Sequence, residues 1–254
     1  MMIVVNKRDP FEASLVKSRR GGRVKQPLSR DAIVIEALRQ LTSDGLEGMS
    51  LRKVAAALDT GPASLYAYVD DLGELHALVL DHALGGVQTQ APARGSWRER
   101  LVAILSSYAL VLSASPGLAK LAFGTVAVGP NALRITEAIL GLLDEGGIDV
   151  AVAAWAVDLL ILYVTAGVAE HADGLDPGAP DGAVAHAVAR ASAREYPRID
   201  ASRAHLLSGT AEQRFSWAID VLLQGLLQAP KPPTAQPRRV ARSTARRPVP
   251  GRSR

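Results

Sequence analysis

Small uncharged side chains gather on one side of a short segment that ends at Val69, and their chemistry suits the edges of base pairs. Built as a helix, the segment directs Leu65 and Val69 to one side. The other side carries Ser64, Ala67 and Tyr68. A serine hydroxyl can donate or accept a hydrogen bond at a base edge, and an alanine methyl can pack against the methyl group of thymine. The spacing therefore predicts a face that fits the major groove of duplex DNA.

Side chains that can bind phosphate surround this face. Arg52 stands in the first turn of the preceding segment, where its guanidinium could form two hydrogen bonds with one guanine; a phosphate contact is the alternative. Ser50, Lys53 and Tyr66 each carry a group that can hydrogen-bond to a phosphate oxygen. For Tyr66 and Tyr68 the alternative is a role in packing. Together these residues predict a reader that anchors on phosphates and recognises bases.

Three short helices must hold these side chains in place. Ser29 and Ser50 are expected to N-cap the first two, and each follows an apolar residue that can pack on another inside the helix. Gly61 and Pro62 open the third, because proline at the first helical position loses no hydrogen bond. Two helices joined by a tight turn, the second with a compact outward face, indicate a helix-turn-helix.

The run from Leu28 to Leu84 resembles the DNA-binding domain of the TetR family of bacterial transcriptional regulators, above all at residues 51–55 and 63–69. The Leu-Tyr-x-Tyr-Val signature at 65–69 is the most specific part of the match. The remainder is similar, more loosely, to the ligand-binding half of the branch that includes the tetracycline repressor. The resemblance implies that the groove is faced by Pro62, Ala63, Ser64, Ala67 and Tyr68.

Two positions depart from the pattern of that family. Asp59 stands where a glycine is usual, although aspartate tolerates the left-handed backbone conformation better than most residues. The fourth helix commonly begins with a lysine that binds phosphate, whereas this chain has Asp70 and Asp71 there. Asp71 and Glu74 are expected to form a capping box instead. The two aspartates place negative charge near the expected DNA backbone, so more of the binding must come from Arg52, Lys53 and the basic N-terminal arm.

The sequence after residue 96 predicts helices throughout. Serine or threonine before a proline or an apolar run marks several starts, and glycine pairs or Gly- and Pro-rich stretches mark the ends. The expected helices cover 97–112, 116–123, 130–144, 148–169, 182–196 and 211–228. No stretch alternates with a period of two, so the predicted fold class is all-α: an N-terminal three-helix helix-turn-helix DNA-binding domain and a C-terminal helical ligand-binding and dimerisation domain.

The stretch from Ile148 to Ala169 is long and apolar enough to cross a bilayer. Asp158 near its middle would cost about 2.5–3.5 kcal/mol there. A helix that is apolar all round can equally be the central helix of a soluble bundle, which is the interpretation favoured here. The family resemblance implies a homodimer whose four-helix bundle uses 148–171 and 211–228 of each subunit.

The charges divide the chain into a basic beginning, an acidic middle and a basic end. Residues 1–30 have a net charge of +6 and residues 230–254 of +8, so the remaining residues carry −10. Basic ends of this kind commonly contact polyanions, and increased solubility is the simpler alternative. We predict a basic flexible arm (1–27), a DNA-binding domain (28–85), a helical ligand-binding and dimerisation domain (86–229), and a disordered tail rich in Pro and Arg (230–254).

Regulation by a small molecule is implied by the resemblance alone. In that family an effector enters a cavity of the helical half, and the fourth helix transmits the change to the DNA-binding domains. Candidate lining residues are Tyr108, Phe123, Trp155 and Tyr163, with Asp158 and His171 as polar anchors; core or interface positions are the alternative. The chain has no cysteine, and His76 and His82 lie on different helix faces, so neither a metal nor a cofactor is expected.

These observations favour a homodimeric, sequence-specific DNA-binding regulator, a repressor rather than an activator, that binds a palindromic operator and is released by an effector. An enzyme finds no support, because no Gly-rich phosphate loop, nucleophile elbow or metal spacing occurs. A non-specific architectural DNA-binding protein would explain the basic ends but not the uncharged reading face. No signal peptide pattern is present at the start of the sequence, so a cytoplasmic location is expected.

Overall fold

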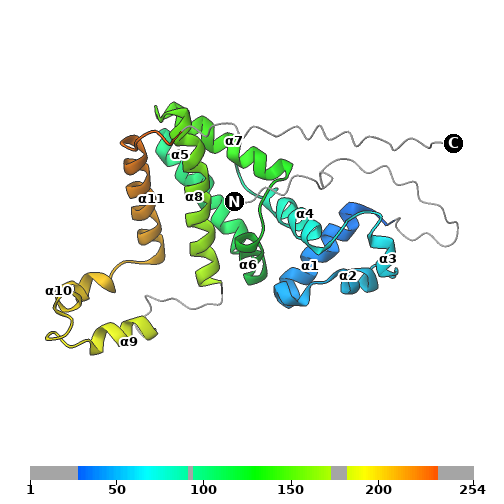
Figure 1. Ribbon diagram of the computed structural model, residues 1–254, viewed down its shortest axis with the longest axis horizontal. Coiled ribbons are helices and arrows are strands. Elements are labelled where there is room, and N and C mark those ends of the chain that lie inside the picture. The colour runs from blue at the N-terminus through cyan, green and yellow to red at the C-terminus, as the bar shows by residue number, and fades with distance from the viewer. Residues whose placement is uncertain (1–27, 91–93, 173–181, 234–254) are drawn as a thin grey trace, which may run out of the picture.

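The computed structural model describes residues 28–90, 94–172 and 182–233, and within these ranges it contains helices and no strand, which confirms the predicted all-α class. The basic arm and most of the basic tail lie outside the described residues. The helices are α1 (Arg30–Gly48), α2 (Leu51–Ala57), α3 (Pro62–Leu65), α4 (Leu72–Leu84), α5 (Trp97–Leu112), α6 (Pro116–Gly124), α7 (Pro130–Glu145), α8 (Val150–His171), α9 (Ala183–Arg190), α10 (Pro197–Leu206) and α11 (Ala211–Leu227), as Figure 1 shows.

The first three helices form a small unit that we call the head. Ser29 and Ser50 cap α1 and α2 as predicted: their hydroxyls accept hydrogen bonds from the amides of Ala32 and Lys53, at 3.1 and 3.3 Å. Gly61 precedes α3 and Pro62 occupies its first turn. The apolar sides of the three helices meet in a common core made of Ile33, Ala37, Leu41, Val54, Ala55 and Leu65, all fully buried.

Helices α5 to α8 form a larger unit that we call the body, and α4 connects it to the head (Figure 1). The central element is α8, which packs against α5, α6, α7 and α11. Among the described residues α8 is also the one unbroken helix long and apolar enough to span a membrane. Its packing on four neighbouring helices is that of a core helix, the alternative favoured from the sequence.

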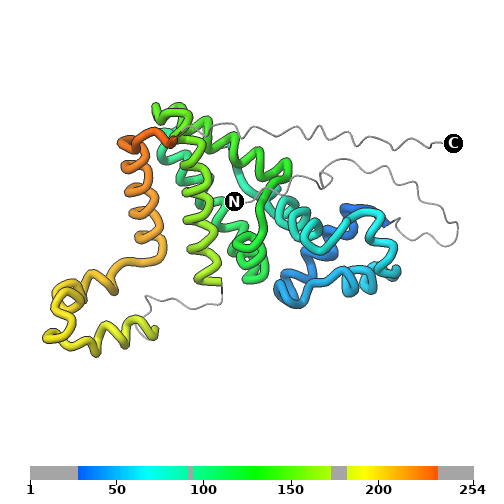
Figure 2. The backbone as a smooth tube through the Cα atoms, in the orientation of Figure 1, coloured from blue at the N-terminus to red at the C-terminus, as the bar shows by residue number. Residues whose placement is uncertain are grey.

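The region between α8 and α11 differs from the sequence prediction. One helix was expected over 182–196, but α9 ends at Arg190 and a separate α10 begins at Pro197. Proline disfavours the helical conformation of the residue before it, so Pro197 starts a helix here instead of marking the end of one. Figure 2 shows α9 and α10 apart from the body, with the chain returning along α11.

Candidate nucleic-acid interface

The candidate DNA-contacting side chains lie on one exposed surface made by α2 and α3. Arg52 and Lys53 project from the first turn of α2, and both are exposed. Around α3 the exposed predicted residues are Pro62, Ala63, Ser64, Tyr66 and Ala67. Ser50 is half-buried because it caps α2. The side chains of Arg52, Lys53, Ser64 and Tyr66 form no hydrogen bond or ion pair with any residue that the structure describes, so their polar groups are available to an external partner.

Buried anchors on the opposite side hold this surface. Leu65 and Val69 are buried in the head, where they fix the position of α3 against α1 and α2. The helix itself is shorter than the sequence indicated, since α3 ends at Leu65 and the chain continues as turns. The amides of Tyr68 and Val69 still donate to the carbonyl oxygen of Leu65, at 2.8 and 3.0 Å. The short segment is therefore rigid enough to present its outward side chains at fixed positions.

The contacts of Tyr68 favour the packing role that the sequence left open as its alternative. Its ring is half-buried, and its hydroxyl donates a 2.7 Å hydrogen bond to the carbonyl oxygen of Leu28. Arg30 donates in turn to the carbonyl oxygen of Tyr68, at 3.2 Å from Nε and 3.1 Å from Nη2, and lies 3.8 Å from Glu74. These contacts join the start of α1, the turn that follows α3 and the start of α4. Tyr68 thus has a structural role, with its partner 40 residues away in sequence.

The two departures from the family pattern have clear structural consequences. Asp59 adopts the left-handed conformation with φ of 51°, as expected for a residue in place of glycine. Asp71 caps α4 by accepting from the amide of Glu74 at 2.8 Å, but the reciprocal bond of a capping box does not form. Glu74 accepts from the amide of Asp70 instead. The acidic residues therefore stabilise the start of α4, where the family commonly has a phosphate-binding lysine.

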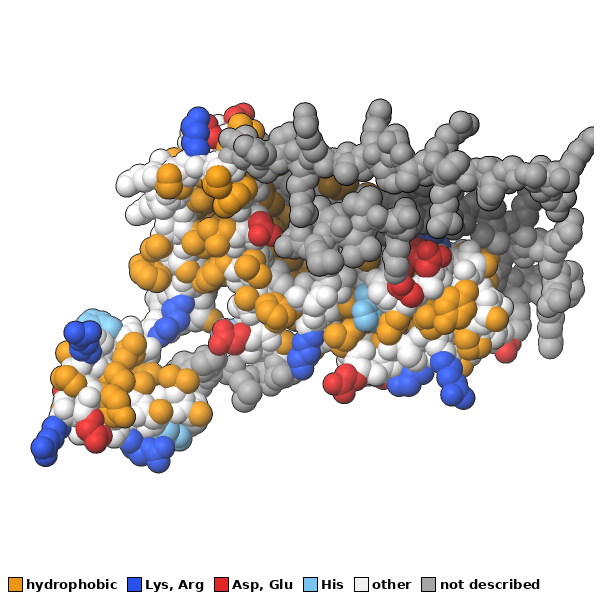
Figure 3. Space-filling model, viewed as in Figure 1, with side chains coloured by type: hydrophobic (Ala, Val, Ile, Leu, Met, Phe, Trp, Pro, Cys, Tyr) orange, Lys and Arg blue, Asp and Glu red, His pale blue; other side chains and the backbone are white. Residues whose placement is uncertain are grey.

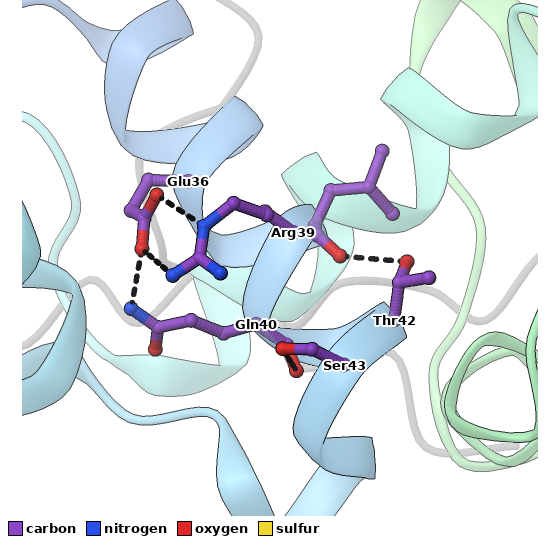
Figure 4. Close-up of polar contacts among 6 residues, drawn as sticks. Glu36, Arg39, Gln40, Thr42 and Ser43 are labelled. Carbon is purple, nitrogen blue, oxygen red and sulfur yellow. Dashed lines mark hydrogen bonds and ion pairs between the residues drawn. The ribbon is translucent and has the colours of Figure 1, made fainter.

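Helix α1 carries a polar cluster that extends from the exposed Arg39 to the buried Gln40 (Figure 4). The carboxylate of Glu36 accepts from Arg39, at 2.9 and 2.7 Å, and from the side-chain amide of Gln40 at 2.8 Å. The hydrogen bonds from Arg39 lower the pKa of the Glu36 carboxyl. Because Arg39 is exposed, the pair adds little to stability. Arg39 is thus paired with Glu36, whereas Arg52 and Lys53 have no acidic partner among the described residues.

A cavity of about 920 Å³ lies between the body and α11. Its walls come from α5, α6, α8 and α11, with Val184 of α9 and Leu206 of α10, and they include the candidates Tyr163 and His171. The rings of Tyr163 and Phe215 stack with their centroids 6.3 Å apart, and burial raises the pKa of the Tyr163 hydroxyl. The ring of His171 shares a 2.7 Å hydrogen bond through Nδ1 with the carbonyl oxygen of Gly167. The cavity combines an aromatic wall with a few polar groups, as small-molecule sites commonly do.

The other four candidate ligand residues do not line this cavity. Tyr108 is buried in the core, where its hydroxyl shares a 2.8 Å hydrogen bond with Thr165 and burial raises its pKa. Phe123 is 62% exposed at the end of α6. Trp155 and Asp158 lie on the outer side of α8, along a separate hollow of about 620 Å³. Helical spacing alone could not separate inner from outer positions on helices that are apolar on every side.

The outer sides of α8 and α11 expose a continuous set of large apolar residues. On α8 they follow the spacing of one helix face, and Figure 3 shows hydrophobic side chains gathered over the α11 region. The exposed members are Trp155, Leu159 and Leu162 on α8, and Trp217, Val221 and Leu227 on α11. Exposed apolar patches are common on surfaces that bind another protein.

A polar junction between α4 and α7 was not foreseen from the sequence. Asp81 of α4 is buried at 5% exposure, and its carboxylate accepts from the amide of Ala132 at 3.0 Å and from the side chain of Asn131 at 3.1 Å. Arg134 of α7 donates back to the carbonyl oxygens of Val87, Leu84 and Gly85 at the end of α4. A carboxylate thus meets the positive end of α7, and a guanidinium meets the negative end of α4.

Comparison with known proteins agrees with this architecture. A family model described as the tetracyclin repressor-like C-terminal domain matches residues 89–229. The HTH-type transcriptional repressor DrrR1 of Streptomyces coeruleorubidus is 34% identical over 125 residues, which make up 49% of this chain and 46% of the repressor. The chain spans about half the length of the curated relatives that it matches.

Solved structures cover more of the chain. A transcription regulator from Streptomyces coelicolor is 41% identical with a TM-score of 0.70, and the match covers 83% of this chain and 100% of that one. The TetR family protein ActR of Streptomyces coelicolor, solved in complex with actinorhodin, is 32% identical with a TM-score of 0.71. That match covers 80% of this chain and 98% of ActR.

Proposed function

The chain belongs to the TetR family of transcriptional regulators, and from this membership we propose that it is a repressor that binds a palindromic operator as a homodimer and is released by a small molecule. The observation that carries the proposal is the surface of α2 and α3. Its outward side chains include unpaired hydrogen-bonding groups, and the buried Leu65 and Val69 fix its position on the core of the head. Such a surface suits a partner with fixed geometry, which duplex DNA provides.

We assign separate roles to the exposed side chains. Ser64, with Pro62, Ala63 and Ala67, would lie against base edges, and Arg52 would pair with a guanine. Ser50, Lys53 and Tyr66 would bind phosphates. Figure 3 shows Lys and Arg side chains at the lower edge of the head, in the region of α2. A regulator of this kind acts on chromosomal DNA, so we place it in the cytoplasm of a bacterium.

The exposed faces of α8 and α11 support the homodimer. Two helices from each subunit can pack as a four-helix bundle, which would cover the exposed tryptophans and leucines of both copies. A two-fold dimer would place two heads on successive half-sites about one helical turn apart. The operator is therefore expected to be a pseudo-palindrome.

The aromatic cavity supports an effector that is itself aromatic. ActR, a similar protein, was solved with actinorhodin bound, and the stacked rings of Tyr163 and Phe215 would provide a wall for a planar molecule. We propose that such a molecule fits the free protein better than the DNA-bound form, so that its binding shifts the population away from the operator.

Selection of bound duplexes from a random DNA pool tests this function. The account expects one recurring sequence with two-fold symmetry, recovered by the full chain. Candidate planar aromatic molecules would then be screened for release of that duplex. Recovery of unrelated sequences with equal affinity would instead support a non-specific architectural protein.

Replacing Arg52 with alanine should weaken binding to the selected duplex about 10- to 100-fold, because one bidentate contact with guanine is worth about 1–3 kcal/mol. The free energy of unfolding should stay within about 0.5 kcal/mol of the original value, since Arg52 is exposed. Fluorescence anisotropy on a panel of single-base variants measures the effect. Discrimination should relax at one base position in each half-site.

The matched control is Arg190→Ala, which removes the same charge from α9, far from the head in Figure 1. It should leave the affinity nearly unchanged. Uniform weakening by Arg52→Ala across all sequences would reassign Arg52 to a phosphate contact. Equal effects of the two substitutions would contradict the placement of the DNA surface on α2.

A further inference from the structure

The first turn of α6 separates the cavity from the head. Ser115, Pro116 and Ala119 line the cavity. The same helix packs against α1, which lies beside it in Figure 1. One turn of α6 thus touches the space that an effector would occupy on one side and the DNA-binding unit on the other.

Gly117 is the point of closest approach between α6 and α1. A β-carbon added at Gly117 would lie 2.6 Å from the carbonyl oxygen of Leu41, 3.1 Å from Leu41 Cδ1 and 3.2 Å from the α-carbon of Gly45. A distance of 2.6 Å is too short for a non-bonded contact between carbon and oxygen. Because the oxygen belongs to the backbone of α1, it could not move aside as a flexible side chain could. Only glycine permits the observed approach of the two helices.

The position on α1 that receives α6 is also where α1 loses its regular geometry. Gly45 has φ of 74° and ψ of −178°, which interrupts the helix before it ends at Gly48. Gly45 itself has a left-handed backbone that other residues rarely adopt. The turn of α6 therefore fits into a notch that two glycines create, one on each helix.

The first turn of α6 is held together by local contacts. Ser115 is buried and its hydroxyl accepts from the amide of Leu118 at 3.1 Å, while Pro116 fixes the backbone of the first residue. The end of α4, in contrast, is tied to α7 by Asp81 and Arg134. A displacement at the cavity wall could therefore reach the head through the direct contact of α6 with α1, beside the contacts that α4 makes with both helices.

We propose that Gly117 is the positioning residue through which the cavity controls the head: its missing side chain lets α6 fit against α1 in the DNA-binding arrangement, and an effector that displaces Pro116 and Ala119 disturbs this fit. The inference rests on the proposed function and names the route of its regulation. It adds the contact of α6 with α1 to the family expectation that the fourth helix transmits the change. Packed interfaces shift between discrete arrangements, so a displacement below 1 Å is enough.

Gly117→Ala tests the route without any effector, because the added methyl group would hold α6 away from α1 permanently. The matched control is Gly124→Ala in the same helix, where an added β-carbon meets no atom within 4 Å. Binding of both variants to the duplex recovered by selection is measured by anisotropy, and folding by circular dichroism. The expected result is at least tenfold weaker binding by Gly117→Ala and unchanged binding by Gly124→Ala. Equal binding by a folded Gly117→Ala protein would overturn the proposal.

Hydrogen exchange of the unaltered full chain provides a second measurement, in case Gly117→Ala does not fold. Adding the selected duplex should increase the protection of peptides covering 41–46 and 117–121 together, although neither segment belongs to the DNA surface. Added protection over α4 with none over 117–121 would overturn the proposal. If the unaltered chain selects no duplex, the proposed function itself has failed, and this is known before any variant is made.

Discussion

Replacing Leu162 with glutamate is expected to separate the two subunits and to weaken binding of the selected duplex at least about 100-fold. Leu162 is 55% exposed on the outer side of α8, in line with Trp155 and Leu159. In the proposed dimer this face is covered, so the new carboxylate would be buried without a partner. An unpaired buried charge costs about 3–5 kcal/mol, and 1.4 kcal/mol corresponds to a factor of ten in the dissociation constant.

The oligomeric state of Leu162→Glu is measured by sedimentation velocity over a range of concentrations. Leu133→Glu provides the control, because Leu133 is 64% exposed on α7 and does not belong to the face on α8 and α11. The control should remain a dimer and bind the duplex normally. A Leu162→Glu protein that stays dimeric would show that the subunits meet elsewhere.

Replacing Asp81 with alanine should lower the free energy of unfolding by about 2–4 kcal/mol, because hydrogen bonds to a charged group contribute about 1.5–3 kcal/mol each. The amide of Ala132 would lose its acceptor, and the side chain of Asn131 would keep only its 3.0 Å hydrogen bond to the backbone carbonyl oxygen of residue 81. No side chain of α7 itself can replace it, since the capping residue Gly129 has none. The midpoint of thermal unfolding should fall by roughly 5–15 °C.

Calorimetry on Asp81→Ala and on Asp144→Ala makes the comparison, since Asp144 is an exposed aspartate at the other end of α7. The control should change the midpoint by no more than a few degrees. Adding Asn131→Ala to Asp81→Ala should cost less than the sum of the two single effects, because both substitutions remove the same hydrogen bond. Additive effects would mean that the two residues do not act together.

Local signals made most of the helix starts predictable. A cap such as Ser29 or Ser50 and the amide that it binds are three residues apart, so sequence contains both partners. The exposed positions of Arg52 and Lys53 likewise follow from the buried Val54 and Ala55 beside them. The sequence therefore predicts the helix starts of the head and the exposure of Arg52 and Lys53.

Contacts between distant residues were beyond this kind of prediction. The hydroxyl of Tyr68 finds its acceptor at Leu28, and the carboxylate of Asp81 finds its donors 50 or more residues later in the chain. Nothing in the local pattern around Asp81 distinguishes it from an exposed aspartate. The candidate ligand residues divide between two hollows for a similar reason, because Trp155 and Tyr163 lie on one apolar helix whose two sides face different surroundings.

A footprint of the full chain on the selected duplex tests the central claim most directly, since that claim is that α2 and α3 read a defined sequence. Hydroxyl-radical cleavage at physiological salt would show which nucleotides are covered. The account predicts two short protected half-sites about one helical turn apart, and a smaller protection when Arg52 is alanine. Uniform protection along the duplex, or the same pattern with Arg52→Ala, would contradict it.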